Sequence, residues 1–224
     1  MSNIISNAAV PESLADILVD LGSVPADRVR LVPRPSTATL QDVTLEIDKG
    51  LRCELIDGTL VDKVMGWQES LIAAYLIEIL GGFVRRSNLG LVTGPDGFVR
   101  LLGSLVRGPD VAFTSWDRLP DHSVPQASIP EVVPDLAVEI ISLSNTRAEM
   151  SRKRREYFHA GVRLVWMVDP RARSVAVYTS ISEYKILDDA MNLEGGNVLP
   201  GLEIELGKLF AELDRRPNMN SDTS

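Results

Sequence analysis

The chain has 224 residues, 45% hydrophobic and 24% charged, an ordinary globular composition with enough apolar material for a core. Its single cysteine, Cys53, excludes an internal disulfide, and with only two histidines the chain offers no Cys/His zinc-ligand set. The formal net charge of −8 argues against nucleic-acid binding if the acidic charge is spread evenly over the surface.

The sequence carries no recognisable membrane or export signal. No apolar run approaches the ~20 residues that a membrane helix needs. The first ten residues lack the basic start and long apolar stretch of a signal peptide. We therefore expect a soluble, cytoplasmic protein without membrane contact.

Residues 1–48 are predicted to form an N-terminal extension. Leucine and isoleucine recur at helical spacing within 12–21, which predicts a short amphipathic helix. The two prolines of 32–37 favour an extended linker after it.

The main domain is predicted to span 49–212. The Asp57-Gly58 pair between apolar flanks predicts a hairpin within 53–61. The clearest helix covers 67–80 and is expected to end at Gly81-Gly82. Residues 89–113 are rich in β-forming residues, and the four prolines of 117–134 suit a surface loop.

The second half of the domain is predicted to alternate strands with a helix. A buried strand at 136–141 precedes a helix at 147–160, which Gly161 stops, and strands follow at 162–168 and 174–179. This order indicates an α/β or α+β fold with a mixed sheet. The polar residues 213–224 are expected to form a disordered tail.

Glu139 is the first candidate for chemistry. Alternation along the 136–141 strand places it on the face opposite Leu136, Val138 and Ile140. An ionised carboxylate among Val and Ile residues is costly unless it is paired or bound to a metal. The residue is therefore either a salt-bridge partner at the rim of the core, or a metal ligand or general base.

Asp110 and Lys153 are candidates only in combination with Glu139. Asp110 follows a proline at the start of a strand, a position that is structural more often than not when it stands alone. Lys153 lies on the more apolar stripe of the 147–160 helix, where it either extends past the core to solvent or meets the acidic face of the Glu139 strand.

Glu69 is a further acidic candidate in the first turn of the 67–80 helix. It shares a helix face with Ile72 and Leu76, but that helix is apolar almost all round. The glutamate can equally serve to stabilise the helix dipole.

Two or more carboxylates and a lysine suit metal-assisted hydrolysis of a phosphodiester. Carboxylate oxygens are ligands for Mg²⁺, and Mn²⁺ can substitute for it. The metal polarises the phosphate and activates a water, while a lysine orients that water or stabilises the developing negative charge. The spacing of these residues is not specific enough to decide for this reaction.

Three segments in the same order resemble the Uma family of restriction-endonuclease-like proteins, within the PD-(D/E)XK nuclease superfamily. They are 107–113 (RGPDVAF), 133–142 (VPDLAVEIIS) and 153–170, with Lys153, Tyr157 and the run 165–170 (VWMVDP). The 54–58 segment (ELIDG) matches the family's early strand turn. The resemblance covers roughly 50–210.

The resemblance implies a mixed central sheet flanked by helices and Mg²⁺-dependent cleavage of DNA. Asp110 and Glu139 would be the two acidic residues of the motif and the metal ligands. Where the plain motif has lysine, two residues after the glutamate, this chain has Ile141. The resemblance suggests that Lys153 takes this role, and it matches Glu69 to a position from which such nucleases sometimes recruit another acid.

The charge is unevenly distributed. Residues 147–173 hold eight Lys and Arg against three Asp and Glu, a net charge of +5, so the rest of the −8 chain carries −13. This segment is either a solvated helix face or a phosphate-binding patch, for which Arg152, Arg154 and Arg155 are the candidates.

The leading hypothesis is a Mg²⁺-dependent DNA endonuclease with Asp110, Glu139 and Lys153 as its catalytic residues. The alternatives are a catalytically silent binding or assembly protein that keeps the nuclease fold, and a hydrolase for another phosphoester. A homodimer is expected, because two sites would be needed to cut both strands of DNA.

Overall fold

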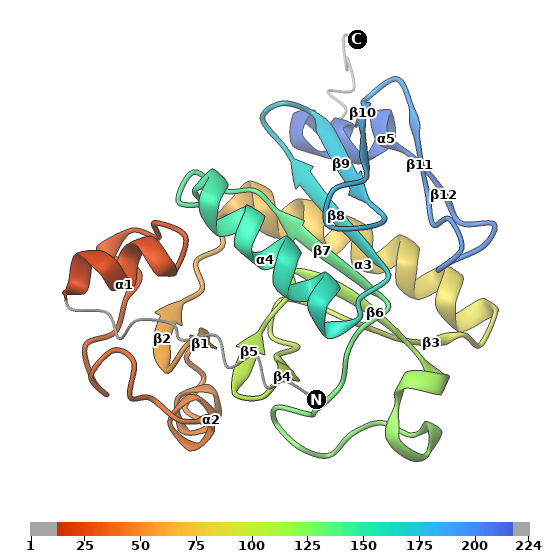
Figure 1. The fold of residues 1–224 in the computed structure, drawn as a ribbon. Coiled ribbons are helices and arrows are strands. Elements are labelled where there is room, and N and C mark those ends of the chain that lie inside the picture. The colour runs from red at the N-terminus through yellow and green to blue at the C-terminus, as the bar shows by residue number, and fades with distance from the viewer. Residues whose placement is uncertain (1–12, 217–224) are drawn as a thin grey trace, which may run out of the picture.

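The computed structural model describes residues 13–216, and a six-stranded mixed sheet forms its centre (Figure 1). The strand order is β10-β9-β8-β7-β6-β3, and every neighbouring pair is antiparallel except β7 and β8. These two are parallel because α4 connects them as a crossover. The strands are β3 (Gly90–Thr93), β6 (Val111–Ser115), β7 (Leu136–Ile140), β8 (Leu164–Asp169), β9 (Ser174–Tyr178) and β10 (Tyr184–Asp188).

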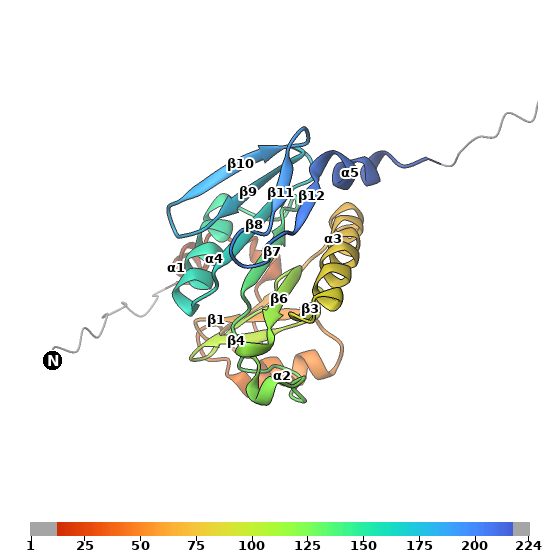
Figure 2. The same cartoon turned by 90° about the vertical axis from the view of Figure 1, so that its right-hand side faces the viewer.

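Two helices cover opposite faces of this sheet (Figure 2). Leu136, Val138 and Ile140 of β7 pack into the core on the side of α3 (Trp67–Arg86). Ala137 packs on the other side with α4 (Arg147–Ala160), toward which Glu139 also points. The predicted alternation along β7 is therefore confirmed, and it places Glu139 under α4.

The bounds of α4 agree with the predicted helix. The Thr146 hydroxyl accepts a hydrogen bond from the backbone N–H of Glu149 at its start, and Gly161 adopts a left-handed conformation at its end, with φ of 99°. Both are common capping interactions at the two ends of a helix.

The α3 helix is longer than predicted, because it continues through Gly81-Gly82 to Arg86. Val84 beyond the glycines is 1% exposed in the main core, and Phe83 packs against that core. Glycine costs a helix about 1 kcal/mol relative to alanine, which the burial of two large apolar side chains outweighs.

A smaller antiparallel sheet, with order β2-β1-β5-β4, lies beside the first. Its strands are β1 (Cys53–Ile56), β2 (Thr59–Asp62), β4 (Val99–Leu102) and β5 (Leu105–Arg107). The predicted hairpin turn at Asp57-Gly58 is confirmed, with positive φ at both residues (47° and 68°). This is the pattern of a tight primed turn, whose twist matches that of the strands.

Residues 13–48 pack against the smaller sheet and α4. They form α1 (Leu14–Asp20), a 3₁₀ turn (Ala26–Arg28) and α2 (Leu40–Asp48). The α2 helix, which begins at a capping box between Thr39 and Asp42, was not predicted from the sequence. The domain boundary at 48 stays a prediction.

The C-terminal part completes the main core. It consists of β11 (Asn192–Glu194), β12 (Glu203–Glu205), α5 (Leu206–Ala211) and the 3₁₀ turn Glu212–Asp214.

The predicted surface loop contains two 3₁₀ turns, Trp116–Arg118 and Pro120–His122. The tail predicted at 213–224 begins within the 3₁₀ turn Glu212–Asp214, where Leu213 packs against the main core, and its residues beyond 216 lie outside the described residues. Within 13–216, no helix is both long enough and apolar enough to cross a bilayer.

Candidate active site

Asp110 joins the start of β6 to the end of β7. Its Oδ2 accepts a hydrogen bond from the backbone N–H of Ile140 at 2.7 Å. Its Oδ1 lies 2.8 Å from Nζ of Lys63, which follows β2 and also donates to the carbonyl of Gly108. The side chain is 6% exposed, so it is held in a fixed orientation next to Glu139.

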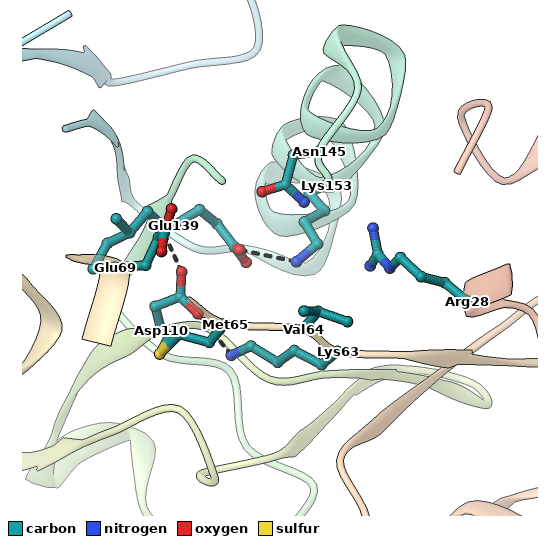
Figure 3. A pocket seen from close by; sticks show the side chains of 10 residues that line it. Arg28, Lys63, Val64, Met65, Glu69, Asp110, Glu139, Asn145 and Lys153 are labelled. Atoms are coloured by element: carbon teal, nitrogen blue, oxygen red, sulfur yellow. Dashed lines mark hydrogen bonds and ion pairs between the residues drawn. The ribbon is translucent and has the colours of Figure 1, made fainter. Parts of the chain in front are cut away.

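Glu139 meets two donors from α4. Nζ of Lys153 lies 2.9 Å from Oε2 (Figure 3). The Tyr157 hydroxyl donates to Oε1. Lys153 and Tyr157 are four residues apart, so they lie on one face of the helix above the strand. Of the two positions that the sequence allows for Lys153, solvent or the acidic face of β7, the structure has the second.

A second buried glutamate, Glu54 of β1, shares Lys153 with Glu139. Its Oε1 lies 3.4 Å from Nζ of Lys153, and its Oε2 lies 2.6 Å from Nη1 of Arg107, which also pairs with Glu156. Burial acts to raise the pKa of Glu54, but Lys153 and Arg107 outweigh it and hold the pKa at about 2. Glu54 thus stays ionised and keeps Lys153 in place.

The pKa of Glu139 is shifted in the opposite direction to that of Glu54. Burial raises the pKa of its carboxyl above the usual value, the charge of Asp110 adds to this effect, and Lys153 opposes it. Burial works against the charge of Lys153 too, but Glu139 and Glu54 raise its pKa above the ordinary lysine value. The lysine is therefore a permanent positive charge at the site.

These groups line a small pocket. Asp110, Glu139 and Lys153 all reach it, as do Lys63 and Arg28 (Figure 3). The structure thus brings the three predicted catalytic residues together at one opening between β2, the ends of β6 and β7, and α4.

Glu69 also lines this pocket, from the first turn of α3. Its side chain is half-buried and folds back against Gly66. The structure therefore places it at the edge of the site, where its role as a supporting acid stays a prediction.

The three arginines predicted to bind nucleic acid have different surroundings. Arg152 is paired with Glu156 and Asp57. The guanidinium of Arg154 lies 4.6 Å from the centre of the Tyr178 ring, a cation–π contact, and Arg155 is exposed. Contact of all three with DNA stays a prediction.

Four residues of the site were not predicted from the sequence: Glu54, Lys63, Arg107 and Arg28. Glu54 carried a usable signal, because it stands inside an apolar strand in the same way as Glu139. Lys63 and Arg28 carried none, since only the tertiary fold brings them to the pocket.

A divalent metal would have two carboxylates as ligands here. Within 13–216, no group of three or more His, Cys, Asp or Glu side chains is arranged to hold an ion. Mg²⁺, however, usually keeps several waters and binds through one or two carboxylates together with substrate phosphates. Asp110 and Glu139 fit such an ion in their donor chemistry, with the remaining ligands coming from water and substrate.

Comparison with known proteins agrees with this fold. A protein from Anabaena variabilis, whose crystal structure is titled that of a "putative nuclease belonging to DUF820", superimposes with a TM-score of 0.68 at 20% identity, over 78% of this chain and 98% of its own. No curated protein matches the sequence. The model of the Uma2 family, described as "Putative restriction endonuclease", matches residues 40–207. With most of its length matched, the chain belongs to the Uma2 family and has the restriction-endonuclease-like nuclease fold.

Proposed function

We propose that the protein is a Mg²⁺-dependent endonuclease that hydrolyses DNA phosphodiester bonds. The observation that carries this proposal is the meeting of Asp110, Glu139 and Lys153 at one pocket, with Lys153 2.9 Å from Glu139. Burial of this lysine costs desolvation free energy, which its pairs with Glu139 and Glu54 offset. Family membership supports a nucleic-acid substrate.

Each residue has a distinct role in this proposal. Asp110 and Glu139 would hold the metal, which would supply polarisation of the phosphate and activation of a water. Lys153, fixed by Glu54 from behind, presents its ammonium to the attacking water or to the charge that develops on the phosphate. Glu69 supports the site from its edge, and the exposed Arg155 is the best placed of the three arginines to meet the DNA backbone.

Plasmid nicking tests the function. We expect the wild-type protein to convert supercoiled plasmid to the nicked form with Mg²⁺ or Mn²⁺ and to lose this activity with EDTA. Binding to DNA should weaken as salt rises, because phosphate contacts release counterions.

A homodimer, as proposed for cutting both strands, would appear by light scattering as twice the monomer mass.

The catalytically silent reading has one observation in its favour. Asp110 is already paired with Lys63, and Glu139 with Lys153 and Tyr157, so both carboxylates have partners without a metal. Calorimetry with Mg²⁺ in the presence of a non-cleavable oligonucleotide separates the two. Binding of Mg²⁺ supports the nuclease, whereas its absence together with absent nicking supports the silent protein.

A further inference from the structure

Arg28 reaches the pocket from the N-terminal segment, before the first residue that the family model matches. The residue is 6% exposed. Its Nε donates to the carbonyl of Asp62 at 2.9 Å, immediately before Lys63. Its Nη1 donates to Oε2 of Glu149 at 3.0 Å, and its Nη2 lies 2.9 Å from Oε1 of the same carboxylate. The guanidinium is thus fixed between β2 and α4.

The segment around Arg28 is docked closely on the start of α4. The Thr146 hydroxyl donates to the carbonyl of Gly22. Gly22 has φ of +87°, and a Cβ there would lie 2.7 Å from the backbone of Glu149, so the approach requires glycine. On the other side of Arg28, Val29 pairs with Val61 of β2. The arginine is therefore held from both sides.

Among the residues 13–216, the contacts of Arg28 leave part of its donor capacity unused. A guanidinium has five N–H groups, and one contact each at Nε, Nη1 and Nη2 leaves an N–H on both Nη atoms. Figure 3 shows the guanidinium turned toward the pocket that Lys63 and Lys153 also enter. An oxygen-rich anion in the pocket would meet these donors without disturbing the pair with Glu149.

We propose that Arg28 binds a phosphate of the DNA substrate, so that the N-terminal segment supplies a substrate-binding residue to the site. The proposal rests on the proposed function for the identity of the substrate. Arginine suits this role because its planar fork matches phosphate oxygens. Glu149 and Asp62 hold the fork in place before substrate arrives, which lowers the entropic cost of binding.

Arg30 provides a matched control in the same segment. It pairs with Asp62 and Glu46 and is not among the residues that line the pocket. The variants are Arg28→Gln, Arg28→Lys and Arg30→Gln, each combined with Glu139→Gln to prevent cleavage. Binding of a fluorescein-labelled DNA duplex is measured with Mg²⁺ at several salt concentrations, together with thermal unfolding of each protein.

Arg28→Gln is expected to weaken DNA binding about tenfold or more relative to Arg30→Gln, because it removes one charge-assisted hydrogen-bonding group from the site. It should also reduce the slope of log K against log salt by about 0.9, the value for one phosphate contact. Arg28→Lys should restore the slope while recovering only part of the affinity. A purely structural role would change the unfolding temperature but leave the salt slope as in Arg30→Gln.

Nicking by the otherwise wild-type protein separates the two proposals. If that protein nicks DNA but Arg28→Gln binds and responds to salt as Arg30→Gln does, the inference on Arg28 is wrong and the nuclease function stands. If it does not nick DNA but Arg28→Gln shows the weaker binding and smaller slope, the inference stands and the nuclease function is wrong. If Arg28→Gln and Arg30→Gln bind DNA equally and the otherwise wild-type protein does not nick it, both proposals are wrong.

Discussion

Glu139→Gln is expected to lower the rate of plasmid nicking by about 10²-fold or more, since a metal ligand contributes several kcal/mol to the transition state. The substitution keeps the size of the side chain and an oxygen that can accept from Lys153 or Tyr157. Initial nicking rates with Mg²⁺ measure the effect, and urea unfolding should confirm that the variant is folded.

Glu183→Gln is the matched control, because it removes an equal charge from an exposed position outside the pocket. Its nicking rate should equal that of the wild type. Equal rates for Glu139→Gln and Glu183→Gln would remove Glu139 from the mechanism.

Lys153→Met is expected to reduce the free energy of unfolding by about 3–5 kcal/mol at neutral pH, because it leaves buried carboxylates without their shared cation. Glu139 and Glu54 lie 2.9 and 3.4 Å from this ammonium. Urea unfolding gives the change. Lys208→Met, which removes an exposed lysine from its pair with Glu205, should leave the free energy of unfolding nearly unchanged, because solvent screens such a surface pair.

The destabilisation by Lys153→Met should depend on pH. Without the lysine, burial and Asp110 still raise the pKa of Glu139. A carboxyl whose pKa is higher in the folded state favours folding at low pH and disfavours it as pH rises above the unfolded value, about 4.5. The cost should therefore be smaller near pH 5 than at pH 8. A cost that grows on acidification would show that Glu139 is not the group left uncompensated.

The fold could be predicted from the sequence where local pattern and tertiary structure agree. Alternation in β7, the Gly161 stop of α4 and the Asp57-Gly58 turn each depend on a period or on a backbone conformation that neighbouring residues dictate. The prediction for α3 was wrong at its end, because burial of Val84 and Phe83 overrides the local preference of two glycines.

The site could be predicted only in part, because tertiary contacts bring some of its residues together. Glu139 and Asp110 stand in recognisable segments. The helical spacing of Lys153 placed it on the more apolar stripe of its helix, which left open whether it meets solvent or Glu139. Arg28 and Lys63 reach the pocket through contacts with Glu149 and Asp110, which are distant in sequence. Such pairings are set by packing of whole elements, so no local pattern could reveal them.

Diffraction from crystals soaked in Mn²⁺ with a DNA oligonucleotide tests the central claim most directly. We expect anomalous density for manganese in contact with the carboxylates of both Asp110 and Glu139, with a phosphate oxygen among the other ligands. Manganese bound elsewhere, or both carboxylates still paired only with Lys63 and Lys153 when DNA occupies the pocket, would contradict it.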